Sequence, residues 1–194
     1  MTTIVFIVNS ILLGVGLAMD AFSVSVANGL NEPCMKRNKM FGIALVFAVF
    51  QALMPMIGWV CVHTILEHFK SFEKFIPWIA LILLLYIGIN MIKEGKEKGE
   101  SCECGEKIGI GTLIVQGIAT SIDALSVGFT IAEHTLLMAL ICTSIIAAVT
   151  FVICTFGVVI GKKVGMKFCG KANIFGGIIL ILIGLEIFLT GIFL

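Results

Sequence analysis

The chain has 194 residues, of which 59% are hydrophobic and only 13% are charged. Soluble domains carry roughly 25% charged residues, so this composition excludes an ordinary water-soluble protein and makes the lipid bilayer the expected solvent. The formal net charge of +1 says little by itself, and no nucleic-acid partner is expected.

Six stretches without Lys or Arg are long enough, or nearly so, to cross about 30 Å of hydrocarbon as a helix. A closed β-barrel also satisfies its backbone within lipid, but these stretches lack the alternating pattern of barrel strands. We therefore predict an all-α integral membrane protein with six transmembrane helices. The predicted spans are Ile4 to Ala27, Met40 to Leu66, Phe75 to Ile92, Ile108 to Ala132, Thr135 to Gly161 and Ala172 to Leu194.

Positive residues gather in the loops after the first, third and fifth predicted spans. Those loops hold eleven Lys and Arg residues, whereas only Lys70 and Lys74 lie between the second and third spans. Because cytoplasmic loops carry the excess of positive charge, both termini are predicted to lie outside.

The cysteines follow the same topology. Cys34, Cys102, Cys104 and Cys169 fall on the predicted cytoplasmic side. Thiols stay reduced in that compartment, so no disulfide framework is expected.

The spans fall into two related halves. Residues 1–92 and 108–194 each hold three spans, and a charged, glycine-containing linker at 93–107 separates them. Met19–Val24 in the first half matches Ile122–Val127 in the second. Because three is an odd number, the second half enters from the opposite side, which predicts inverted repeats about a pseudo-two-fold axis in the membrane plane. Secondary transporters of this design bind their substrate near the midplane between the repeats.

Only three formally charged residues lie inside the spans: Asp20, Asp123 and Glu186. Each costs about 2.5 to 3.5 kcal/mol near the bilayer centre, and no Lys or Arg lies in a span to pair with it. Hydrogen bonding between protonated carboxyls is one explanation. The other is that acidic oxygens from both halves converge in a sealed core and share a bound cation. Asn90, the repeat counterpart of Glu186, would add an oxygen.

Gln51 and Pro55 lie four residues apart in the second span. Proline cannot donate to the carbonyl four residues earlier, so Gln51 offers a backbone oxygen as well as its side-chain oxygen. An ordinary helix kink is the alternative explanation. Oxygen ligands favour Mg, Ca or Mn, whereas sulfur and imidazole favour softer metals. The predicted metal ligands are Asp20, Asp123, Glu186, Asn90 and Gln51, with Ser23, Ser126, Thr150, Thr120 and Pro55 as supporting residues.

Two matched motifs, Gly16–Phe22 (GLAMDAF) and Ala119–Leu125 (ATSIDAL), together with the six-span length and the duplication, resemble the MntP family of manganese efflux pumps. The resemblance implies Mn(II) export from the bacterial cytoplasm across the inner membrane, with Asp20 and Asp123 as the acidic residues of the transport site. It also implies a transporter and not an enzyme, with Mn(II) as cargo and no cofactor. Oligomeric state is left open.

The expected mechanism is alternating access, with the ion bound between the halves. Three carboxylates minus a divalent ion leave one negative charge, so a proton could couple transport to the proton gradient. Two alternatives stay open: an amino-acid or amine exporter of similar fold, and a membrane thiol-disulfide electron carrier. The latter needs paired reactive cysteines, and aspartates occupy the matched positions instead.

Overall fold

The computed structural model describes residues 3–64, 76–97, 108–168 and 171–193, and helices account for nearly all of them. The prediction of an all-α protein is therefore confirmed. The elements are α1 (Thr3–Asn31), α2 (Arg37–Thr64), α4 (Ile76–Glu97), α5 (Ile110–Thr120), α6 (Ile122–Thr130), the short 3-10 helix η1 (Ile131–Glu133), α7 (Leu136–Phe168) and α8 (Lys171–Phe193).

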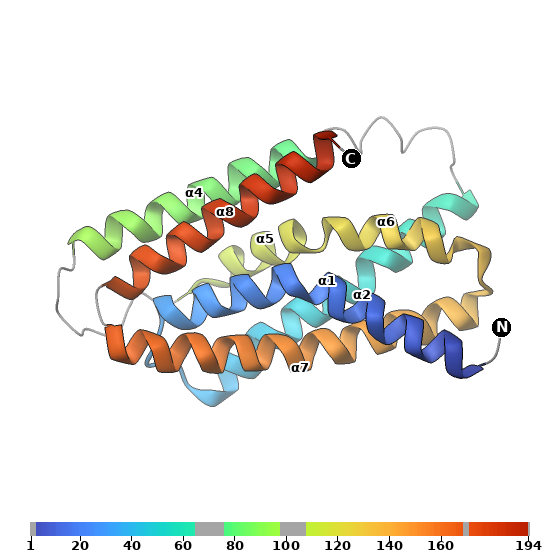
Figure 1. The fold of residues 1–194 in the computed structure, drawn as a ribbon, viewed down its shortest axis with the longest axis horizontal. Coiled ribbons are helices and arrows are strands. Elements are labelled where there is room, and N and C mark those ends of the chain that lie inside the picture. Colours follow the sequence, from blue (N-terminus) through green and yellow to red (C-terminus); the bar gives the residue numbers. More distant parts are fainter. Residues whose placement is uncertain (1–2, 65–75, 98–107, 169–170, 194) are drawn as a thin grey trace.

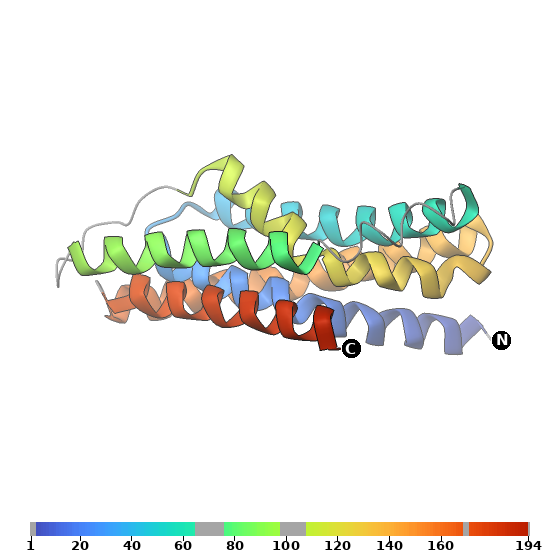
Figure 2. The same ribbon diagram turned by 90° about the horizontal axis from the view of Figure 1, so that it is seen from above.

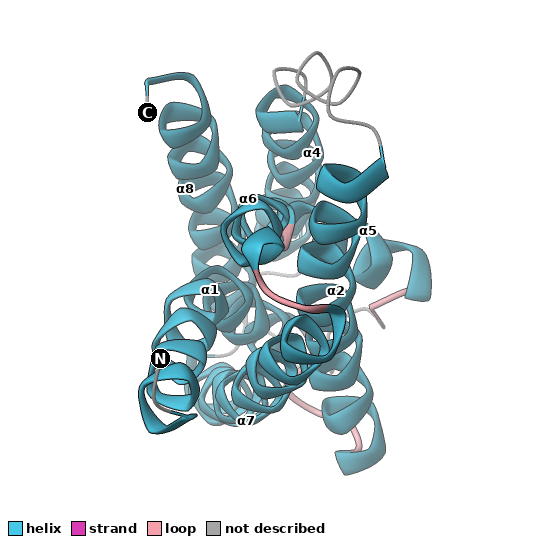
Figure 3. Ribbon diagram, turned by 90° about the vertical axis from the view of Figure 1, so that its right-hand side faces the viewer, coloured by secondary structure: helices cyan, strands magenta, loops and turns pink. Residues whose placement is uncertain are grey.

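The helices lie side by side along one long axis (Figure 1). Followed along the chain, α1, α4 and α7 run in one direction, and α2, the α5–α6 pair and α8 run in the other. The view from above preserves this layered, lengthwise arrangement (Figure 2). Seen from the end that carries the N-terminus, α4 and α8 lie together on one side of the bundle, and α1, α2 and α7 lie on the other (Figure 3).

Three helices, α1, α2 and α7, are each long and apolar enough to cross a membrane. The α5–α6 pair makes a fourth if the two bent pieces count as one span. In α8, Ile174–Ile183 is a shorter apolar stretch within the residues that the structure describes. The chain is thus a multi-pass membrane protein by these helices, and the number of six crossings stays a prediction.

Large apolar side chains cover the outside of the bundle. They include Leu12, Phe41, Ile82, Phe156 and Leu182, each at least half exposed. Water disfavours so continuous an apolar surface, whereas lipid chains solvate it. The exposed surface therefore agrees with a bilayer as solvent.

The fourth predicted span, Ile108 to Ala132, is not one straight helix. It is bent by 41° between α5 and α6, at Ser121. The Thr120 hydroxyl donates to the carbonyl oxygens of Gln116 at 2.9 Å and Gly117 at 3.4 Å, and the Ser121 amide donates to the Ile118 carbonyl. Such hydroxyl bonds to the preceding turn bend helices, which hydrophobic length alone does not reveal.

Glycines allow several helices to touch backbone to backbone. A Cβ on Gly58 of α2 would lie 2.4 Å from the Leu125 carbonyl oxygen of α6. A Cβ on Gly161 of α7 would lie 2.2 Å from the Val26 carbonyl oxygen of α1. In membranes, where lipid is as apolar as leucine, close packing of small residues is a main source of helix association.

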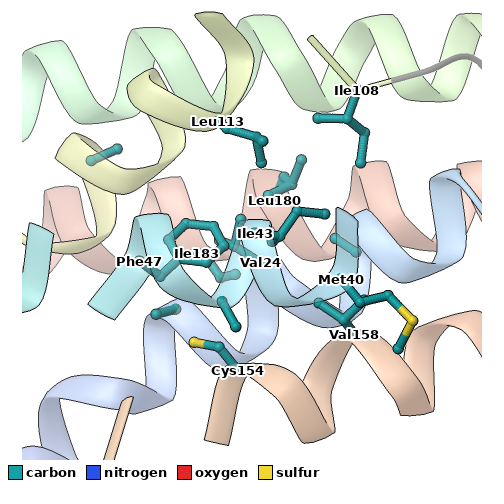
Figure 4. Packing of buried hydrophobic residues seen from close by; sticks show 14 of the residues in the cluster. Val24, Met40, Ile43, Phe47, Ile108, Leu113, Cys154, Val158, Leu180 and Ile183 are labelled. Atoms are coloured by element: carbon teal, nitrogen blue, oxygen red, sulfur yellow. The ribbon is translucent and has the colours of Figure 1, made fainter. Parts of the chain in front are cut away.

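The interior is filled where α1, α2, α5, α7 and α8 meet (Figure 4). Phe47 and Ile43 of α2 are fully buried there, together with Val24 of α1 and Leu180 of α8. This apolar core holds the bundle around the polar residues described below.

Two further expectations need correction. The fifth span was expected to end at Gly161, but α7 continues to Phe168 and carries Lys162 and Lys163 within the helix. Long lysine stems can follow a helix while the ammonium reaches water, so a charge does not end a helix. Cys34, in the turn between α1 and α2, is disulfide-bonded. The expectation of reduced thiols rested on compartment alone, which does not decide which cysteines lie within bonding reach.

Candidate metal-transport site

The two motif aspartates lie in neighbouring parts of the bundle. Asp20 is half-buried in the continuous helix α1, and Asp123 lies exposed in the first turn of α6. Their carboxylates are close enough to interact electrostatically. The Asp123 carboxylate also accepts a hydrogen bond from the Ala124 amide at 2.9 Å. The two acids therefore lie within electrostatic range of one another, but the side chain of Asp123 is exposed and does not lie in the sealed core that the sequence suggested.

The exposure of Asp123 follows from the helix break. A bend of 41° at Ser121 starts a new helix just before the aspartate and frees the amides of its first turn. These amides and the positive end of the α6 dipole stabilise negative charge at that position. Asp20 does not lie at a helix start, because α1 is unbroken from Thr3 to Asn31.

Gln51 joins the backbones that carry the two aspartates. Its side-chain Nε2 donates to the Leu17 carbonyl of α1 at 3.0 Å and to the Thr120 carbonyl of α5 at 3.1 Å. Leu17 precedes Asp20 by three residues, and Thr120 precedes Asp123 by three residues. One fully buried amide thus holds the equivalent carbonyl of each motif.

These bonds also fix the orientation of the Gln51 amide. Two carbonyl oxygens can only accept, so the nitrogen must point at them and Oε1 must point elsewhere. Within the described residues, Oε1 is buried without a hydrogen-bond partner, as are Ser121 Oγ and Thr150 Oγ1. Thr150 is the repeat counterpart of Gln51, on α7. Buried oxygens normally have partners, so these three are available acceptors for a bound cation.

The remaining predicted residues are less close to this arrangement. Asn90 is half-buried in α4; Glu186 lies in α8, and its side chain is outside the described residues. Trp78 of α4 packs edge-on against Phe188 of α8, and Gly88 meets Gly177, so the two helices are antiparallel. This register separates the Asn90 and Glu186 backbones by roughly 16 Å along the helices. The structure does not bring that pair together.

The supporting residues divide into buried and exposed. Thr120, Thr150 and Pro55 are buried, whereas Ser126 is exposed and Ser23 is half-buried. The Ser23 hydroxyl donates to the Met19 carbonyl of its own helix at 3.1 Å. Among the side chains that the structure describes, no three His, Cys, Asp or Glu residues form a metal-binding group. The candidate site therefore consists of the two aspartates together with the buried neutral oxygens of Gln51, Ser121 and Thr150.

Sequence reasoning missed a second polar cluster that joins α1 to α5. Asn28 and Gln116, both buried, donate to each other's side-chain oxygens at 2.8 Å and 3.1 Å. Just after the end of α1, buried Glu32 accepts from the Ile108 amide at 3.0 Å and pairs with Lys39. The available signal was amides in otherwise apolar stretches, within the same predicted spans as the two aspartates.

Comparison with known proteins gives consistent matches. The sequence model of a family described as "Putative manganese efflux pump" matches residues 34–188. A protein of Methanosphaera stadtmanae with the name "Putative manganese efflux pump MntP" is 40% identical over 179 residues, covering 92% of this chain and 97% of that protein. Proteins with that name from Clostridium perfringens SM101 and, as MntP 2, from Clostridium botulinum Hall are 43% and 44% identical, covering 96% and 94% of this chain and equal shares of their own lengths. No solved structure matches.

Proposed function

The chain belongs to the manganese efflux pump family, a family of metal-ion transporters and not of enzymes, and from that premise we propose that it exports Mn(II) from the cytoplasm through a site centred on Asp20 and Asp123. One observation carries the proposal. Gln51 joins the backbones from which the two motif carboxylates project, and these carboxylates lie within electrostatic range of one another.

The chemistry of the donors favours a hard divalent ion. Two carboxylates neutralise the ion's charge, and the Gln51, Ser121 and Thr150 oxygens are buried acceptors within the described residues. Mn(II) accepts oxygen ligands of this kind, whereas zinc and copper sites are richer in thiolate and imidazole. Carboxylates at membrane depth are costly unless they face a partner or an aqueous path, which supports a role in transport.

An inverted repeat is the architecture that we propose for this site. Helix directions reverse between the halves (Figure 1), and equivalent glycines make equivalent contacts. Gly58 meets the Leu125 carbonyl, and its counterpart Gly157 meets the Phe22 carbonyl. Phe22 and Leu125 occupy matching motif positions. On this proposal the ion reaches the aspartates from either membrane face in turn.

The direct test measures cellular manganese. Cells that lack their own manganese exporter and express the wild-type chain should hold less Mn and tolerate more external Mn than cells expressing Asp123→Asn at the same membrane level. Equal manganese content in the two strains contradicts the proposal. Competition by Mg, Ca and Zn in proteoliposomes then measures selectivity.

Proton coupling is a separate part of the proposal. If Glu186 contributes a third carboxylate beside the two aspartates, one negative charge remains beside a divalent ion, so a proton can travel in the opposite direction. An inward-directed proton gradient should accelerate Mn efflux from oriented vesicles, and an uncoupler should remove the acceleration. If the Mn flux does not change with an imposed proton gradient, proton coupling is contradicted, while Mn export is not.

Because Cys34 is disulfide-bonded, the alternative function of a thiol-disulfide electron carrier also needs a test. Cys61, Cys142 and Cys154 are free cysteines. A variant with all seven cysteines of the sequence replaced should keep its Mn flux. Loss of flux in that variant, together with thiol-dependent electron transfer by the wild type, favours the electron carrier instead.

A further inference from the structure

A buried amide pair closes the bundle between the aspartates and one of its ends. Asn28 of α1 and Gln116 of α5 are 1% and 0% exposed. Each side-chain nitrogen donates to the other's oxygen, at 2.8 Å and 3.1 Å. The pair is thus fully satisfied across two helices that come from different halves of the sequence.

The position of the pair relates it to the transport site. Asn28 follows Asp20 by eight residues, and Gln116 precedes Asp123 by seven. At 1.5 Å per residue, the amide pair lies roughly 10 to 12 Å from the aspartates along the helices. It lies on the side of Lys36 and Arg37, which is the end predicted to face the cytoplasm.

A second layer of contacts lies beyond the pair. Glu32 binds the Ile108 backbone amide and the Lys39 ammonium, which joins the end of α1 to the approach to α5 and to the start of α2. Lys162 of α7 donates to the Met35 carbonyl in the connecting turn at 2.8 Å. Four segments are therefore held together at this end.

At the opposite end, the counterpart positions among the described residues hold no polar pair. At the repeat offset of 103, the counterparts of Asn28 and Gln116 are Ile131 and Leu13. Ile131 is buried and Leu13 is half-buried, and both are apolar. The amide pair is consequently a feature of one end only, and not a consequence of the internal duplication.

A gate must open at a low cost in free energy, whereas a purely structural contact between helices need not. Separated amides hydrogen-bond to water in place of each other, so the open form costs little, whereas separated apolar side chains lose their burial. On the proposed function, an ion that enters from the lysine-rich end passes the level of this pair on its way to the aspartates.

We propose that Asn28 and Gln116 form the cytoplasmic gate of the ion path, with Glu32 and Lys39 as its outer reinforcement. This inference rests on the proposed function for its ion, but its test does not use Mn. The structure has the gate closed.

The test measures access to a reporter cysteine at Ser121, which is buried at the helix break. The background lacks native cysteines, and a membrane-impermeant maleimide is applied separately to each face in vesicles of both orientations. Asn28→Ala leaves the Gln116 amide unpaired, so it should open the gate and raise labelling from the lysine-rich face by about tenfold, as expected for the loss of such bonding.

A second variant should lower the labelling of the reporter cysteine. Asn28→Leu with Gln116→Met replaces both amides by apolar groups of similar size, which keeps packing but removes the favourable hydration of the open state. Labelling from the lysine-rich face should fall below that of the parent protein. Ile131→Ala, at the counterpart position, is the matched control and should leave labelling from that face unchanged.

Opposite changes in the two variants support the gate. Changes of the same sign, or none, overturn it, because a purely structural pair would alter stability without a direction of access. The outcome is independent of the transport assignment: if Asp123→Asn retains manganese export while labelling shifts as expected, the gate stands and the proposed ion site fails.

Discussion

The two aspartate motifs share their sequence but not their local structure. Asp20 lies in a helix that continues for 29 residues, whereas Asp123 begins a helix of nine residues just after a bend. The residues before each aspartate differ: Leu17 and Ala18 in the first motif, Thr120 and Ser121 in the second. Leucine and alanine favour helix, while the Thr120 hydroxyl bonds to its own preceding turn. A duplicated motif can thus acquire two conformations through two neighbouring side chains.

The largest expected difference between the motifs concerns the length of the acid. Asp123→Glu should lower Mn flux by about 100-fold, because the Ala124 amide fixes its carboxylate and the first turn of α6 fixes its backbone. Asp20→Glu should cost about tenfold, since Gly16 beside it leaves open space. Initial rates in proteoliposomes measure both, and an equal loss at the two positions contradicts this asymmetry.

Loss of the Gln51 side chain, which joins the two motifs, should lower Mn flux less than lengthening Asp123. Gln51→Leu removes two hydrogen bonds and an available oxygen, so Mn flux should fall by about tenfold and unfolding free energy by about 2 kcal/mol. Thr150→Val, at the repeat counterpart, removes an oxygen that has no partner among the described residues. It should reduce flux without loss of thermal stability. Comparing flux with detergent-solubilised melting separates the two roles.

Straightening the second motif should have a smaller effect. Thr120→Val with Ser121→Ala removes the hydroxyls at the break and gives residues closer to those of the first motif. Flux should fall by about threefold, and amide hydrogen exchange near Asp123 should slow as the helix becomes continuous. Unchanged exchange would mean that other contacts impose the bend.

The smallest effect on Mn flux is expected at Gly16, where the first motif has space for a larger side chain. No atom lies within 4 Å of a Cβ built on Gly16, and the second motif has Ala119 at the matching position. Gly16→Ala should therefore leave flux unchanged and stabilise α1 by about 0.5 to 1 kcal/mol. Gly128→Ala is the contrasting control, because its Cβ would lie 2.4 Å from the Pro55 carbonyl oxygen. It should lower the melting temperature.

The sequence predicted what depends on hydrophobic length and on charge. Apolar stretches predicted helices, and formal negative charges within those stretches indicated Asp20 and Asp123. It did not predict the bend at Ser121, since the competing hydroxyl bond depends on which rotamer Thr120 adopts. It also missed Asn28 and Gln116, because neutral amides separated by 88 residues carry no formal charge and only the fold brings them together.

The glycine contacts have a consequence for the autonomy of the two halves. Gly29 meets Gly161, Gly58 meets Gly128, and Gly88 meets Gly177, so each of these contacts pairs one half with the other. A half expressed alone therefore lacks the backbone surface against which its own helices pack. A gene cut within residues 93–107 should yield two polypeptides that accumulate in the membrane only when they are made together.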